Sequence, residues 1–145
     1  MADKEKKIKK VTLELNEEQA MIVQAALEEW FRIRMGQSHD LANDLAFMGY
    51  KRDDKDHQER FTAAITKRNS LEYVLKALFN IAWPHYGVPQ EIDDRTHIAS
   101  DIWSTMRHKL WKARTDGTDD WRVDSATPIQ LGPEPLPVVT VIMED

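Results

Sequence analysis

The sequence predicts a mainly α-helical domain of about four helices, with a short N-terminal strand and a short C-terminal strand that form a small ribbon. Apolar residues recur at helical spacing between residues 17 and 114, and glycine or proline interrupts these segments. Both ends of the chain carry short runs of strand-like composition or alternation. The chain has 145 residues, of which 41% are hydrophobic, so we expect one domain with a buried core.

The first strand and the first helix follow each other closely. Residues 11–15 alternate apolar and polar side chains, which is the period of a half-buried strand. Asn16 is a favourable N-cap, and the acidic residues after it suit the first turn of a helix. We therefore expect a helix from Glu17 to about Met35, ended by a left-handed glycine at Gly36.

Three further helices are predicted by the same criteria. The short one ends at a glycine, Gly49, and the last one ends before the turn-forming pair Asp116-Gly117. Pro84 and Pro89 predict a loop between the last two helices. The expected ranges are 40–48, 57–80 and 94–114, the last starting at Asp94 or Thr96.

The C-terminal tail differs in composition from the helical part. Five prolines and glycines from Pro128 onward exclude a regular helix there, and residues 136–142 are rich in valine and isoleucine. We expect three parts: a flexible basic N-terminus over 1–10, a helical domain over 11–114, and an acidic, proline-rich tail over 115–145. The strand that ends this tail packs back on the domain or pairs across a subunit interface, which would make the protein an oligomer.

Composition excludes several classes of protein. The chain has no cysteine, which removes disulfide scaffolds, thiolate zinc sites and thiol nucleophiles. No apolar run approaches the length of a membrane span, so a soluble, cytoplasmic protein without a membrane partner is expected. The formal net charge of −5 and the confinement of excess positive charge to a short terminus disfavour duplex nucleic acid as a partner.

The first long helix ends in polar residues where its apolar stripe should continue. Val23, Leu27 and Trp30 share one stripe, and Arg34 lies only about 20° from it. Gln37 falls about 40° to the other side. Either Arg34 extends to water at the exposed end of the stripe, or Arg34 and Gln37 line a pocket for an anion or a planar polar ligand.

The second long helix carries a similar interruption. Arg68 lies on the apolar face, and Glu72 follows one turn later. This spacing is the ordinary geometry of an intrahelical ion pair, which we expect in preference to a ligand contact.

The last helix places an arginine between two tryptophans. Trp103, Arg107 and Trp111 follow one another at four-residue spacing. Guanidinium groups stack on indole faces, so the three side chains predict a local cation–π stack. The same arrangement would also suit a platform for a base or nucleotide.

His97, Asp101 and His108 lie on the other side of the last helix. His97 and Asp101 are spaced for one metal, but Asp101 and His108 are about 10 Å apart along the axis. A solvated face is the expected alternative, and we predict neither a metal nor a cofactor. Phosphate-binding loops, nucleophile elbows and kinase motifs are absent from the sequence, so it does not indicate an enzyme.

One resemblance adds to this interpretation. The segment Trp30–Gln37 resembles the Arg-x-Gly-Gln helix end of a family of small uncharacterised bacteriophage and prophage proteins. Similar segments follow in the expected order at 86–88, 98–102, 106–110 and 134–137. The sequence departs from that pattern at Ser100 and Trp103, where tyrosine and glutamine are expected. The resemblance implies a phage-encoded accessory protein in the host cytoplasm and brings no known activity.

The positions shared with that family coincide with several of those singled out above. The shared positions are Arg34, Gly36, Gln37, Asp101, Arg107 and His108. The ligand-binding residues that we predict are Arg34, Gln37, Asp101, Trp103, Arg107, His108 and Trp111.

Three classes of function are open on the sequence. The first is a binding protein that interferes with a host process, such as defence, by sequestering a nucleotide-like signal or by occluding a host protein. The second is a small enzyme acting on nucleotides or nucleic acid, with Asp101, Arg107 and His108 as its acid–base and phosphate-binding groups. The third is a structural or assembly protein of the virion. We favour the first because the sequence lacks a catalytic signature.

Overall fold

A computed structural model describes residues 8–53, 55–78, 92–115 and 123–144. These residues form four α-helices and one short 3-10 turn, which confirms the predicted mainly helical fold with four helices. No strand occurs among the described residues, so the predicted terminal ribbon is not confirmed. The elements are α1 (Glu17–Arg34), α2 (His39–Ala46), α3 (His57–Leu78), α4 (Asp94–Thr115) and η1 (Val123–Ser125).

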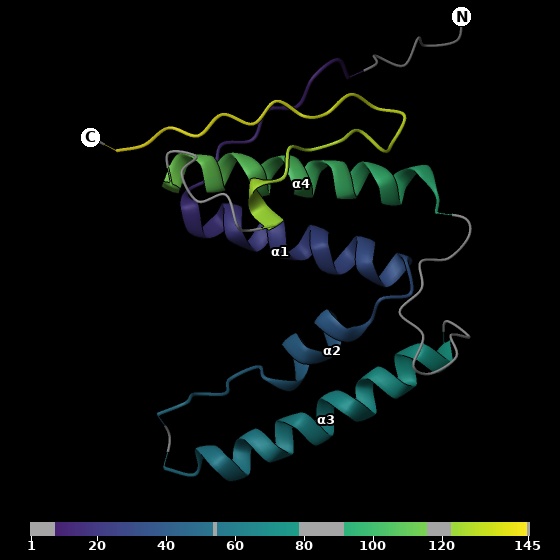
Figure 1. Ribbon diagram of the computed structural model, residues 1–145, viewed down its shortest axis with the longest axis vertical. Helices are drawn as coiled ribbons and strands as arrows, with labels where there is room; N and C mark the ends of the chain where they lie inside the picture. Colours follow the sequence, from purple (N-terminus) through teal and green to yellow (C-terminus); the bar gives the residue numbers. More distant parts are fainter. Residues whose placement is uncertain (1–7, 54, 79–91, 116–122, 145) are drawn as a thin grey trace, which may run out of the picture.

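Helices α1 and α4 pack against each other as an antiparallel pair (Figure 1). Polar contacts join them at both ends of the pair. Arg34 at the end of α1 donates a hydrogen bond of 2.9 Å to Thr96 in the first turn of α4. At the opposite end, Arg114 donates a hydrogen bond of 2.7 Å to Glu17. The C-terminal tail lies on the side of α4 that faces away from α1 (Figure 1).

Helices α2 and α3 form a second pair that extends away from the first (Figure 1). Three alanines, Ala42, Ala46 and Ala64, are buried where the two helices meet, because a small side chain allows the backbones to approach closely. Among the described elements, α3 packs only against α2. Within the same residues, none of the helices combines the length and the apolar character of a membrane span.

Both ends of α1 have the capping groups that the sequence predicts. Asn16 and Gln19 exchange side-chain to backbone hydrogen bonds of 2.9 and 3.0 Å at the start of the helix. Gly36 has a φ of 76°, and its N–H donates to Ile33 while the N–H of Gln37 donates to Arg32. This pair of bonds closes the last turn of the helix and requires the left-handed residue at Gly36. The helix itself ends at Arg34, one residue before the predicted end.

The buried stripe of α1 is rotated from the one that the sequence predicts. Phe31 is the buried aromatic residue of this helix, whereas Trp30 is 39% exposed. The reason lies in α4, which presents Trp103 edge-on to Phe31 at 5.2 Å between ring centroids. Trp30 lies at the margin of the interface, where its ring packs under the Arg34 guanidinium at 4.7 Å. The expected core position of Trp30 is therefore wrong.

The expected ion pair between Arg68 and Glu72 is replaced by another one. Glu72 pairs with Lys76, one turn later, at 3.2 Å, and approaches His39 of α2 at 3.3 Å. Arg68 instead donates to Asn69. Burial alone would raise the pKa of Glu72, but hydrogen bonds from His39 and Lys76 outweigh it, so the pKa lies below its ordinary value.

This buried pair should couple strongly to the stability of the α2–α3 unit. Glu72→Leu or Lys76→Leu alone should lower the free energy of unfolding by about 1–3 kcal/mol, because each removes one member of a buried, charged pair. The double variant Glu72→Leu/Lys76→Leu should cost less than either single one. Urea denaturation measures all three, and simple addition of the two single losses would contradict the buried pairing.

Candidate functional site

Three of the predicted site residues of α4, namely Asp101, Arg107 and His108, contact the C-terminal tail. Asp101 is only 3% exposed, and its carboxylate lies in the middle of the helix. It accepts hydrogen bonds of 3.0 Å from the N–H of Leu131 and 2.8 Å from the N–H of Gly132. A buried carboxylate needs such donors, so the tail supplies them and is fixed against α4 in return.

Gly132 is required at this junction because the tail comes very close to α4. A Cβ atom at this position would lie 3.1 Å from the backbone nitrogen of Ile98 and 3.3 Å from a carboxylate oxygen of Asp101. Both neighbours belong to a packed helix and have little room to move. The glycine therefore allows the two backbone donors to reach Asp101.

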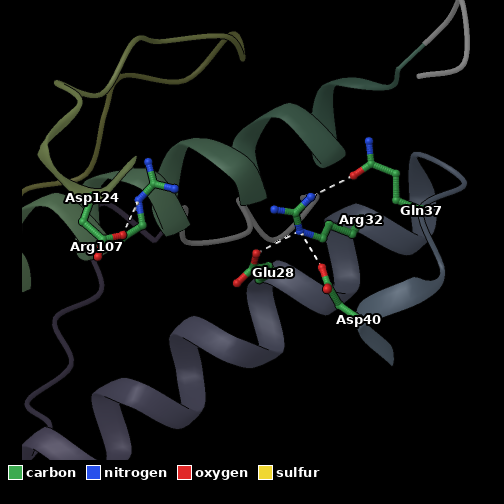
Figure 2. Close-up of polar contacts among 6 residues, drawn as sticks. All are labelled: Glu28, Arg32, Gln37, Asp40, Arg107 and Asp124. Atoms are coloured by element: carbon green, nitrogen blue, oxygen red, sulfur yellow. Dashed lines mark hydrogen bonds and ion pairs between the residues drawn. The ribbon is translucent and has the colours of Figure 1, made fainter. Parts of the chain in front are cut away.

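A second attachment joins α4 to η1 through Asp124 (Figure 2). The carboxylate of Asp124 lies 3.4 Å from Nε of Arg107, and its backbone oxygen lies 3.2 Å from Nδ1 of His108. Burial lowers the pKa of the Arg107 guanidinium while Asp124 raises it. Guanidinium remains charged in proteins, so Arg107 and Asp124 form an ion pair at the start of the tail.

Trp103 lies at the centre of an aromatic and cationic cluster between α1 and α4. Arg107 lies over its ring at 4.1 Å from the centroid, and Arg32 lies 6.0 Å away. Phe31 contacts the ring edge-on. The indole N–H of Trp103 is buried and has no hydrogen-bond acceptor among the described residues. Such a donor is uncommon in proteins and is one feature of this cluster that its packing does not explain.

Arg32 belongs to this cluster, although sequence reasoning selected Arg34 instead. Its guanidinium makes ion pairs of 2.8 Å with Glu28 and 2.9 Å with Asp40, and donates a hydrogen bond of 2.9 Å to Gln37 (Figure 2). Glu28 and Arg32 are four residues apart on one helix, and this spacing is the signal that would have identified them. The hydrogen bond between Gln37 and Arg32 therefore places Gln37 near the Trp103 cluster.

Arg34 lies at the same end of α1, two residues beyond Arg32, and helps to cap α4. It forms an ion pair with Asp93 and donates a hydrogen bond to Thr96. Asp93 in turn accepts hydrogen bonds from the Thr96 hydroxyl at 2.7 Å and the Thr96 N–H at 2.8 Å. These bonds from Thr96, together with Arg34, lower the pKa of Asp93 to about 2.

The remaining predicted residue, Trp111, is buried in the domain. It is 8% exposed, and its ring lies 5.5 Å from that of His108. The structure therefore brings Gln37, Trp103 and Arg107 toward one cluster and places Asp101 and His108 against the tail. In the part of the chain that the structure describes, no three histidine, aspartate or glutamate residues are grouped to hold a metal ion.

Beyond these attachments the tail runs in an extended conformation. Val138 is 95% exposed and Ile142 is 89% exposed, whereas Val139 and Val141 between them are half-buried. This alternation is that of a strand with one face on the domain and the other in solvent. Residues 138–144 form no hydrogen bond with any other described residue. We call this stretch the tail strand-like segment.

Comparison with known proteins identified no relative. No family model matches the chain, and neither a curated protein nor a solved structure matches it. The resemblance to phage proteins therefore stays a prediction.

The Asp101 attachment predicts a measurable change when one of its acceptors is lost. Asp101→Asn should lower the free energy of unfolding by about 1–3 kcal/mol, because an amide NH₂ then faces the backbone donors of the tail. Limited proteolysis should cut the tail faster in this variant and in Gly132→Ala. Asp53→Asn, at an exposed position, is the matched control. Equal proteolysis of Asp101→Asn and the control would contradict the attachment.

The cap at Asp93 predicts a pH dependence in acid. Because the folded-state pKa of Asp93 is about 2 against an ordinary value of 3.8, its stabilising contribution is present above pH 3.8 and is lost as the pH falls through about 2. Asp93→Asn retains a capping oxygen but cannot titrate. Its helical circular dichroism should therefore depend less on pH between 3.8 and 2 than that of the unmodified protein, and an unchanged pH profile would contradict the assignment.

Proposed function

We propose that this protein acts by binding rather than by catalysis, and that it binds an extended segment of a partner protein along the tail strand-like segment. The observation that carries the proposal is the extended backbone of residues 138–144, which is without internal hydrogen bonds among the described residues. An unpaired extended backbone is a template for an added strand.

The side chains of this segment support the same conclusion. Val138 and Ile142 project into solvent, and apolar residues on the exposed side of a strand favour pairing with a second apolar strand. Val139 and Val141 lie on the opposite, half-buried side. A partner strand would then lie beside the segment and gain both backbone hydrogen bonds and apolar contacts.

The attachments at Asp101 and Asp124 make the segment suitable for binding. They hold the tail against α4 before any partner arrives. Preorganisation lowers the entropy that must be lost on association, so a short strand contributes more affinity than it would in a free chain. This gives Asp101, Arg107 and His108 a positioning role.

Charge restricts the chemistry of the partner segment. From residue 123 to the end the chain carries four acidic residues, Asp124, Glu134, Glu144 and Asp145, and neither lysine nor arginine. The occupant is therefore an apolar strand flanked by basic residues. Residues 9–15 of the chain begin with two lysines and continue with alternating apolar and polar residues, so they would compete with the partner. If the phage resemblance holds, the occupant belongs to a host protein whose strand is occluded.

Photo-cross-linking in the producing cell tests the proposal. A photoreactive amino acid at position 138 should become covalently linked to a different protein. The link should lie within one apolar segment of that protein that is flanked by basic residues. Thr140→Pro should abolish that product, because proline removes a backbone donor that the free chain does not use. Thr140→Val, which keeps the donor, is the matched control and should retain it.

Two outcomes would contradict this function. One is a product that contains only copies of this chain, which would assign the segment to self-association. The other is a foreign product that Thr140→Pro leaves unchanged, since that excludes strand addition.

A second candidate function is binding of a small anionic, aromatic ligand at the Trp103 cluster. The buried indole N–H without an acceptor and the two adjacent guanidinium groups favour it. The carboxylates that already pair with Arg32 and Arg107 would oppose it, so such a ligand must displace them.

Isothermal titration against a panel of nucleotides and cyclic nucleotides tests this second candidate. A ligand of this site should bind the unmodified protein, and Arg107→Gln should weaken the binding at least about tenfold by removing the cation on Trp103. Lys112→Gln, at an exposed position of α4, is the control. The absence of heat across the panel would exclude the candidate.

A further inference from the structure

The side of α1 that faces away from α4 carries exposed apolar residues between acidic ones. We propose that this side, called the α1 outer face, is a docking surface for a basic amphipathic helix of a partner protein. The face consists of Glu18, Ile22, Ala25, Ala26, Glu29 and Ile33. The proposal does not depend on the tail strand-like segment.

These six residues form one stripe along α1. At about 100° per residue they lie within an arc of about 100°, and the buried Phe31 lies about 170° from the middle of that arc. Ile22 is 63% exposed, and both alanines are exposed. Helix α4 packs on the Phe31 side of α1 and therefore leaves the stripe uncovered. The other described element that contacts α1 is α2, which approaches it at the Glu29 end.

At the Glu29 end of this face, two carboxylates lack a cation. Arg32 already pairs with Glu28 and Asp40. Glu29 instead shares a hydrogen bond with Asp44 of α2, and neither of the two makes an ion pair with any residue that the structure describes. Burial and the neighbouring carboxylates, Asp44 foremost, raise the pKa of Glu29. A cation supplied by a partner would relieve this repulsion.

The charges of the face select a basic protein segment as the occupant. Glu18, at the other end of the stripe, likewise has no ion pair within the described part of the chain. Nucleic acid and anionic lipid headgroups would be repelled by these carboxylates. A second copy of this chain would be repelled as well. Antiparallel pairing about the middle of the stripe places Glu18 on Glu29, and parallel pairing places each glutamate on its own counterpart.

A helix fits this face better than a strand does. The backbone groups in the middle of α1 are used by its own hydrogen bonds, so a strand would gain no backbone pairing there. Ala25 and Ala26 lie in the middle of the stripe and allow a second helix to approach closely, with the larger Ile22 one turn earlier. Glu18 and Glu29 are about 16 Å apart along the axis. The matching basic residues of the partner helix are therefore about three turns apart.

A synthetic helical peptide tests the proposal. Its leucines lie on one side at helical spacing, and its lysines stand at the two ends of that side, about three turns apart. Isothermal titration should show one-to-one binding to the unmodified protein that weakens with added salt. The same peptide with glutamate in place of lysine, and a scrambled peptide of the same composition, should bind at least about tenfold more weakly. Equal affinity of either peptide, or no binding of the lysine peptide, would overturn the proposal.

A charge reversal on the protein locates the binding site. Glu29→Lys should weaken binding of the lysine peptide at least about tenfold and should strengthen binding of the glutamate peptide, because it exchanges the complementary charges. Glu59→Lys, at an exposed position of α3, makes the same change in net charge and is the matched control. It should leave both affinities nearly unchanged. Equal effects of the two variants would mean attraction by net charge alone and would overturn the site. Retention of helical circular dichroism shows that the variants fold.

Discussion

The buried carboxylate of Asp101 is the constraint on which the rest of the α1–α4 unit depends. An ionised group in the middle of a packed helix is tolerated only where donors surround it, and the donors here are the backbone N–H groups of Leu131 and Gly132. The carboxylate therefore ties the tail to the domain across about thirty residues of sequence. The tail beyond Gly132 therefore starts from a fixed point on α4.

The arginines illustrate how a charge that looks like a ligand site can serve the fold. Arg34 pairs with Asp93 and supports the start of α4, whereas Arg32 gathers Glu28, Asp40 and Gln37 at the end of α1. Each guanidinium has several donors in a planar arrangement, so one side chain can join two or three elements at once. For this reason, arginines at the end of α1 make several of the polar contacts that join the helices.

The two helix pairs have different relations to solvent. The α1–α4 pair is enclosed by the tail on one side and joined by polar contacts at both ends. The α2–α3 pair is held by alanine contacts and by the buried charges of Glu72 and Lys76, and no other element of the described residues packs against α3. The proposed partner strand uses the tail, which lies on the α1–α4 pair.

The sequence alone determined where helices begin and end. Asn16, Gly36 and Gly49 act through the backbone of their own neighbours, so capping and left-handed geometry could be predicted within a residue or two. It also selected Asp101, Arg107 and His108 as residues of unusual position, and all three contact the tail or η1.

Only the tertiary structure decided which face of each helix is buried and which partner each charge takes. Phe31 rather than Trp30 is buried because Trp103 of α4 lies against it, and Glu72 pairs with Lys76 because α2 covers that side of α3. Arg32 joins the Trp103 cluster because α4 places the Trp103 ring beside it. Helical period fixes relative angles within a helix but not its rotation about its own axis, and that rotation is set by residues distant in the sequence.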